Sequence, residues 1–331
     1  MTHWSRTWMV GFSLVASSAF AAEAEKLEAP AATYKLRYKF QSGETLRWEV
    51  EHRAEVRTTV GGTTQTAETN TTSVKVWKVS EITPDGDAKF VYSVDSVDMR
   101  QKLTGRQEVR YNSKTDKEPP VGFQDAAKSV GVPLTTFVMS PTGKIVTRSE
   151  HLDRSANQSS HPSIPLPEDA VPLGHKWSFD YEVTATARDR AIKKVQMRQQ
   201  MTLDEVKNGI AIISVNTQIL TPVRNDPTIE AQLVQSESEG KIRFDIDAGR
   251  MVSLQSDLDK HVVGFQGEAS SLHCVTRFAE KLMPGELKAA AKPATVAGPQ
   301  PPKTSAPAAI AKPAPKAPAA TTRRPPARRT R

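Results

Sequence analysis

Residues 46–60 read LRWEVEHRAEVRTTV, and this stretch decides the fold class. Apolar residues occupy every second position over most of it, and charged residues fill the positions between them. Successive side chains of a β-strand point to opposite faces, so the pattern predicts one long strand with an apolar face and a charged face. Fifteen extended residues would span about 50 Å, so we expect the strand to bend or curl. The apolar face carries Leu46, Trp48, Val50, Ala54, Val56 and Val60, and the charged face carries Arg47, Glu49, Glu51, Arg53, Glu55 and Arg57.

Similar alternation recurs on both sides of the middle of the chain. Residues 34–40 and 177–183 alternate apolar and polar side chains, and Asn208-Gly209 is typical of a two-residue hairpin turn. No long segment has a helical period, and we expect only one short helix, over residues 123–129. The sequence therefore predicts a mainly β protein with little helix, built from antiparallel, strongly curved sheets or partly open barrels.

The two halves of the chain share a layout that indicates an internal duplication. Three turn-and-strand segments of the first half match three of the second, namely Gly43–Trp48 with Gly174–Phe179, Pro84–Gly86 with Lys207–Gly209, and Ser140–Val146 with Ile246–Val252. We therefore predict two tandem β domains, residues 34–150 and 174–283, joined by a Pro- and Ser-rich linker over residues 151–173. The alternative is that hairpins of different origin share such turns.

The first 21 residues have the pattern of a secretory signal peptide. Arg6 precedes a short apolar stretch, and Ala19-Phe20-Ala21 places small residues at the −3 and −1 positions of a cleavage site. We expect cleavage after Ala21, a disordered leader over residues 22–33, and a mature chain in the periplasm, at the cell surface or outside the cell. The apolar stretch is too short to span a bilayer, so we expect no transmembrane span in the mature chain; the alternative is an uncleaved anchor.

Positive charge is concentrated at the C-terminus. Residues 284–331 contain ten Lys and Arg and one acidic residue, whereas residues 22–283 contain 34 basic and 36 acidic residues. The same C-terminal segment holds eleven prolines and few large apolar side chains, so we expect a disordered tail. We predict that the tail contacts an anionic cell-envelope polymer or lipid surface, and we expect no specific nucleic-acid binding by an exported protein; the alternative is a solvated spacer. The arginines predicted to make this contact are Arg323, Arg324, Arg328, Arg329 and Arg331.

Catalytic and metal-binding motifs are missing from the sequence. It has no Gly-x-Ser-x-Gly, no Gly-rich phosphate loop, and no two histidines spaced as a metal pair within one strand or helix. Asp245 and Asp247 match no calcium loop and are typical of a turn. Cys274 shares a face with apolar residues, so we expect its thiol to be buried. His273 would point to the opposite face, which argues against a Cys–His catalytic pair. We therefore expect no enzyme, no cofactor and no metal, and a hydrolase is the least favoured function.

Aromatic residues form a stripe on the predicted apolar faces. A curved sheet with such a stripe could carry an apolar ligand or a lipid, and the ordinary alternative is that the rings form the core. The residues predicted to line such a site are Tyr38, Phe40, Trp48, Trp177 and Phe179.

The opening Gly43–Trp48 and the segment Gly240–Arg250, together with the two-copy layout, resemble a family of secreted, duplicated all-β proteins found mainly in Planctomycetes. The resemblance covers residues 34–282 and implies a Gram-negative envelope setting. The family has no assigned activity, so it implies no catalytic or binding residues. More loosely, the curved sheets are similar to periplasmic lipoprotein-carrier half-barrels, from which this sequence departs by lacking clear lid helices.

Overall fold

The computed structural model describes residues 32–152, 163–223, 226–237 and 239–284. The predicted signal peptide, almost all of the leader, residues 153–162 of the linker and the basic tail after residue 284 lie outside these residues. The helices are α1 (Gln124–Ser129), α2 (Pro227–Leu233) and the 3-10 helix η1 (Val234–Ser236). The strands are β1 (Thr33–Tyr34), β2 (Thr45–Val60), β3 (Thr63–Ile82), β4 (Ala88–Leu103), β5 (Val109–Asn112), β6 (Pro133–Met139), β7 (Ile145–Glu150), β8 (Val171–Pro172), β9 (Lys176–Thr186), β10 (Ile192–Lys207), β11 (Ile210–Ile219), β12 (Glu239–Asp245), β13 (Arg250–Val263) and β14 (Ser270–Leu282).

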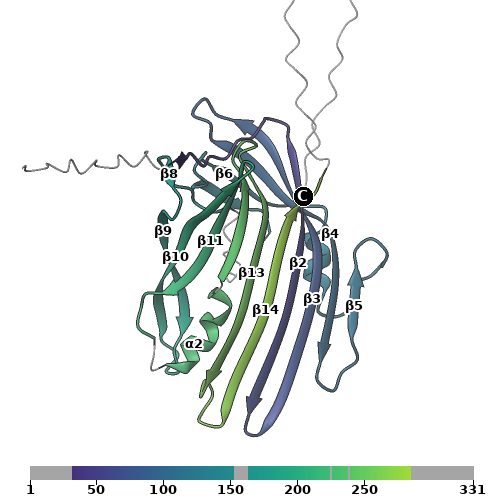
Figure 1. The fold of residues 1–331 in the computed structure, drawn as a ribbon. Coiled ribbons are helices and arrows are strands. Elements are labelled where there is room, and N and C mark those ends of the chain that lie inside the picture. Colours follow the sequence, from purple (N-terminus) through teal and green to yellow (C-terminus); the bar gives the residue numbers. More distant parts are fainter. Residues whose placement is uncertain (1–31, 153–162, 224–225, 238, 285–331) are drawn as a thin grey trace, which may run out of the picture. The chain divides into compact units, whose positions relative to one another are not determined.

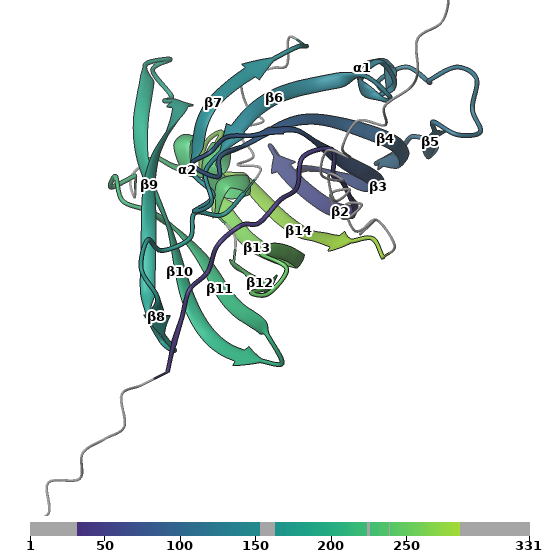
Figure 2. The ribbon, with the colours of Figure 1, turned by 90° about the horizontal axis from the view of Figure 1, so that it is seen from above.

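Twelve of these strands join in one antiparallel sheet, which curves strongly (Figures 1 and 2). Its order is β7-β6-β4-β3-β2-β14-β13-β12-β11-β10-β9, and β5 pairs with β4 beside this path. Over the described residues the ladder ends at β7 and at β9, so the sheet is open and is not closed into a barrel. The prediction of a mainly antiparallel β protein with little helix is confirmed.

The two halves of the chain meet in the middle of this sheet. Each half is a series of hairpins, and β2 of the first half pairs antiparallel with β14 of the second, from Trp48 opposite Leu282 to Val60 opposite Ser270. The two segments predicted as tandem domains therefore share one sheet. Pairing with β14 satisfies the backbone groups along β2 that would otherwise be left open at an edge. The turns at Gly43 and Gly174 precede β2 and β9, as the predicted duplication requires, and the duplication itself stays a prediction.

The strand register sorts side chains onto two faces. Residues directly opposite each other on paired strands project to the same side, and Trp48 lies opposite Lys75 on β3 and opposite Leu282 on β14. We call this side the inner face and the other side, which bears Arg53 and Arg57, the outer face. The largest core cluster is built on the inner face from strands of both halves. Its fully buried members include Leu36, Leu46, Val79, Phe90, Phe137, Met139, Met201, Leu203, Ile213, Ile242 and Phe244.

The described part of the predicted linker packs onto this core. Ile164, Leu166 and Val171 are buried, and they interrupt the run of prolines at 162, 165, 167 and 172. The backbone is extended as predicted, but its apolar side chains hold it against the sheet instead of leaving it between two bodies. Val171–Pro172 also pairs with Thr33–Tyr34, where the predicted leader meets the first predicted domain, to form the small β1–β8 sheet.

The segment between β1 and β2 spans one end of the curved sheet. The backbone N–H of Tyr38 donates to the carbonyl of Pro141, in the turn between β6 and β7, at 2.8 Å, and that of Lys39 donates to Gly249, in the turn between β12 and β13, at 2.9 Å. Figure 2 shows this N-terminal segment crossing that end of the sheet. The segment therefore ties the two halves together independently of the β2–β14 pairing.

Two short helices accompany the sheet. The helix predicted over residues 123–129 is present as α1. Helix α2 was not predicted, and together with η1 it covers part of the inner face of the second half. Ile229 and Leu233 pack against Val195 and Met197, and Val234 packs against a second cluster on β13 and β14.

Candidate functional site

The five aromatic residues predicted to line an apolar site all lie at the main core. Tyr38 and Trp48 are buried, and Phe40, Trp177 and Phe179 are partly buried against the same cluster. Tyr38 meets Phe244 edge-on with ring centroids 5.3 Å apart. The Trp177 Nε1–H donates to the carbonyl of Pro165 at 2.7 Å, so this ring also anchors the predicted linker. All five therefore pack in or against this one cluster, and a ligand-lining role for them stays a prediction.

A charged pair marks the place where this core ends. Lys75 of β3 and Glu280 of β14 form an ion pair on the inner face, although their side chains are only 14% and 5% exposed. The Lys75 Nζ lies 5.0 Å from the ring centroid of Trp48 and 4.9 Å from that of Trp77. Such contacts between a cation and aromatic faces are favourable and become more so where water is excluded. The pair therefore clamps β3 to β14 across β2.

Beyond this pair the inner face is only partly covered. Val56 and Phe278 are half-buried there, and His52 is exposed beside Phe278 with ring centroids 6.3 Å apart. Partial desolvation lowers the pKa of His52. His52 therefore lies at the open part of the inner face, opposite Phe278 on the neighbouring strand. This apolar and half-exposed surface is where the sheet could hold a molecule without unpacking its core.

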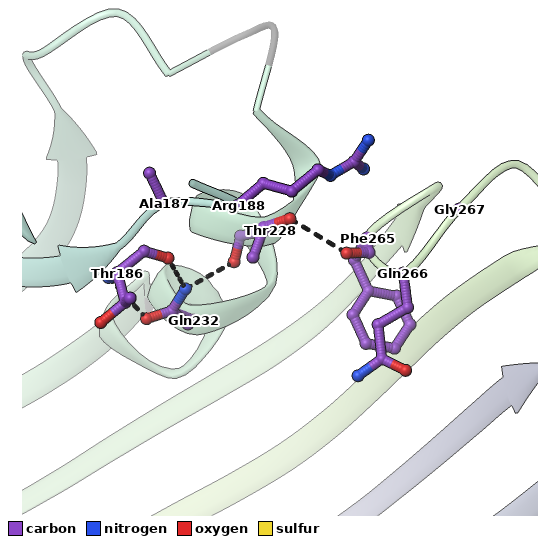
Figure 3. Close-up of a pocket in the computed structure, with 8 residues that line it drawn as sticks. All are labelled: Thr186, Ala187, Arg188, Thr228, Gln232, Phe265, Gln266 and Gly267. Atoms are coloured by element: carbon purple, nitrogen blue, oxygen red, sulfur yellow. Dashed lines mark hydrogen bonds between the residues drawn. The ribbon is translucent and has the colours of Figure 1, made fainter. Parts of the chain in front are cut away.

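A pocket of about 590 Å³ lies beside α2, as drawn in Figure 3. The Gln232 side chain accepts from the Thr186 N–H at 2.9 Å and donates to the Thr186 carbonyl at 2.6 Å. The Thr228 hydroxyl donates to the carbonyl of Phe265 at 3.0 Å. These bonds fasten α2 between the β9–β10 and β13–β14 turns. The pocket is lined by Thr186, Ala187, Arg188, Thr228, Gln232, Phe265, Gln266 and Gly267.

Sequence reasoning identified none of the residues of this pocket. They come from three separate stretches of chain that carry no motif, and only the fold brings them together. The signal for α2 itself was present. Asp226 caps the helix through a bond from the Ile229 N–H at 3.3 Å, and Pro227 stands at the first helical position.

The outer face carries ion pairs between neighbouring strands. Arg198 binds Asp180 through two bonds of 2.7 and 2.8 Å, and Arg277 binds Asp257 at 2.7 Å. Hydrogen bonds from these arginines lower the pKa of both carboxyl groups, and Gln255 assists at Asp257. The charges of these two pairs are therefore matched within the sheet.

Several other sequence predictions concern reactive groups. Cys274 is buried, as predicted, and burial raises the pKa of its thiol. The Asp245 carboxylate accepts from the Ala248 N–H at 2.8 Å, which is the predicted turn chemistry.

Within the described ranges, no group of three or more His, Cys, Asp or Glu side chains is arranged to hold a metal ion. No helix in the same ranges is both long enough and apolar enough to cross a bilayer.

No protein-family model and no curated protein matches the chain. Among solved structures, a lipovitellin structure described as showing lipid–protein interactions is similar over 74% of this chain, with 12% identity and a TM-score of 0.40. The chain spans 25% of that lipovitellin chain. The translocator domain of the autotransporter NalP from Neisseria meningitidis aligns over 73% of this chain and 89% of its own, with 6% identity and a TM-score of 0.19. Neither likeness is close enough to assign a fold family or a function.

Proposed function

We propose that the chain is a secreted, non-catalytic binding or scaffolding protein of the cell envelope whose basic C-terminal segment contacts an anionic surface. The separation of charge carries this proposal. Ten Lys and Arg stand against one acid in residues 284–331, and the remainder after the signal-like segment is close to neutral. The signal-like N-terminus supports the envelope setting.

The difference in how the charges are used strengthens the proposal. Arg57, Arg198 and Arg277 on the outer face of the sheet have carboxylate partners on their own or neighbouring strands. The C-terminal segment has one acidic residue for ten basic residues, so most of its positive charges have no acidic partner within the segment. Each Lys or Arg held near an anionic membrane contributes about 1 kcal/mol, and contacts of this kind weaken as salt rises.

The test compares the mature chain from Ala22 with a form that ends at Met283, which keeps every described strand and helix. Binding to vesicles of anionic and of neutral lipid is measured by co-sedimentation at low and high salt. We expect the full chain to bind anionic vesicles at low salt and to be released by salt. A matched full-length chain with glutamine in place of Arg323, Arg324, Arg328, Arg329 and Arg331 should lose most of the binding. Equal binding by the truncated form would contradict a role of the C-terminal segment in surface contact.

A second function is favoured by the partly covered inner face, namely carriage of an apolar ligand or a lipid. Val56, on β2, and Phe278, on β14, face the same side there and remain half-exposed. Native mass spectrometry of the chain isolated from envelopes, before and after mild denaturation, tests it. For the wild-type chain we expect a bound mass that is lost on unfolding. The Val56→Glu variant should lack this mass, and the outer-face control Val275→Glu should retain it. A clean unliganded mass for the wild-type chain would count against carriage.

A further inference from the structure

Three side chains line up across the central strands on the outer face. His273 of β14 lies directly opposite Arg57 of β2 and directly opposite His261 of β13. These three strands run side by side in the sheet (Figure 1). Together with Ser271 the three residues line a hollow of about 230 Å³. Two histidines that are twelve positions apart in the chain thus become nearest neighbours on one surface.

The two imidazole rings are close and are inclined to each other. Their centroids are 5.8 Å apart, with an angle of 66° between the ring planes. His273 Nε2 lies 2.8 Å from the Asp259 Oδ1. When Nε2 donates its proton to this carboxylate, Nδ1 keeps a free lone pair, and the ring is fixed in orientation. A carboxylate that orients the far nitrogen of a histidine is the usual outer-shell partner of a metal-binding imidazole.

The charges around the pair favour a cation. The Arg57 Nη2 is 3.1 Å from the Glu55 carboxylate, so its positive charge is matched on its own strand. Asp259, which lies two positions before His261 and on the same face, adds a further negative charge. Lys260 projects to the inner face and pairs with Glu237 at 3.2 Å, so it does not oppose a cation at the outer face. With both imidazoles neutral, the immediate surroundings carry one more negative than positive charge.

We propose that His261 and His273 form a binding site for a divalent transition-metal ion of the class that prefers imidazole nitrogen, such as Zn²⁺, Ni²⁺ or Cu²⁺. The two imidazoles supply the protein ligands, Asp259 orients His273, and water completes the coordination. A site with two protein ligands on an open surface binds its ion reversibly. This inference is independent of the function proposed above.

The test is calorimetric titration of the untagged full-length chain with Zn²⁺ and with Cu²⁺ at neutral pH. We expect one ion per chain. His261→Ala and His273→Ala should each remove the binding, and Asp259→Asn should weaken it by about 10- to 100-fold, the usual effect of losing an outer-shell partner. His151→Ala removes an exposed histidine of the first half and is the matched control, for which we expect unchanged binding. Because these residues are on the surface, circular dichroism should show all four variants folded.

A second measurement locates the ion. Proton NMR of the imidazole signals with substoichiometric Cu²⁺ should broaden those of His261 and His273 before those of the other histidines. Acidification should release the ion, because metal ligation needs neutral imidazole. Binding that survives the double variant His261→Ala/His273→Ala would overturn the proposal. Heat of binding with inorganic phosphate but none with either metal would also overturn it, because it would show an anion site instead.

Discussion

The inner and outer faces of the central strands are built from the same stretches of chain, yet they are held together differently. On β14 the inner face presents Cys274 and Glu280, both buried, whereas the outer face presents Arg277, which is exposed and paired with Asp257. The concave side of a curved sheet brings side chains together, and the convex side spreads them apart. Curvature therefore leaves the inner face to provide the core, while the outer face relies on matched charge.

The test with the largest expected effect removes one apolar side chain from each face. Phe90 is fully buried and packs against Phe137 and Trp77 with ring centroids 5.0 and 5.4 Å away. Phe90→Ala should lower the free energy of unfolding by about 3–5 kcal/mol, because it leaves a cavity in the core. The control Val263→Ala removes an outer-face side chain that is 59% exposed and should change stability by less than about 0.5 kcal/mol. Urea denaturation measures both, and equal losses would refute the assignment of the faces.

The second test compares ion pairs on the two faces. Glu280→Gln leaves the Lys75 ammonium without its partner inside the inner face and should cost about 3 kcal/mol. On the outer face, Arg53 lies 3.4 Å from Glu51, both side chains are exposed, and Glu51→Gln should cost less than about 1 kcal/mol. The double variant Lys75→Met/Glu280→Leu should recover most of the loss in denaturation experiments. A double variant as unstable as Glu280→Gln would mean that the loss does not come from an unpaired charge.

The third test concerns the cover of the inner face. Asp226→Ala removes the side-chain cap of α2 and should cost about 1 kcal/mol. Amide hydrogen exchange in residues 227–233 should become faster, while exchange in β10 and β14 stays slow. Asp125→Ala, in the first turn of α1, removes a carboxylate that is not a cap and serves as the control. Faster exchange throughout the sheet would show that α2 is part of the global core and not a local cover.

The smallest effects should appear on acidification, in two separate windows. The pKa of His52 is below its usual 6.5 and that of Asp257 is below its usual 3.8, so in both cases the unfolded chain binds more protons. Stability is therefore complete above each usual pKa and falls as the pH drops through the lowered value. Denaturation over a pH series should show a step below 6.5 that His52→Gln removes, and one below 3.8 that Asp257→Asn reduces. If His52→Gln leaves the upper step unchanged, the inner-face desolvation is not its cause.

Much of the local structure could be predicted from the sequence because alternation reports the face of a strand. Leu46 and Trp48 are buried and Arg53 is exposed, as the pattern of residues 46–60 predicts. Cys274 and His273 lie on opposite faces for the same reason. The short helix predicted over residues 123–129 is present as α1.

Neighbours across the sheet could not be predicted, because periodicity gives the face of a residue and not its partner. Nothing in the sequence places β2 beside β14, and the pairing of His261 with His273 depends on that register. The prolines of residues 162–172 predict a linker, but the apolar residues Ile164, Leu166 and Val171 that lie among them make it pack on the core. Helix α2 has seven residues, which is too few to show a helical period. The only sequence signal for this helix is the N-terminal pair Asp226-Pro227.

The pairing of β2 with β14 also has a consequence for how fast this protein folds. The strands β2 and β14 are separated by more than two hundred residues of chain. A loop of that size must close before these two strands can pair with each other. Topologies dominated by such distant contacts fold slowly. Until closure, one side of β2 is an open template for pairing with other chains, and its alternating charges are the feature that discourages such association. The outer-face charges therefore protect β2 while this loop closes, as well as the finished surface.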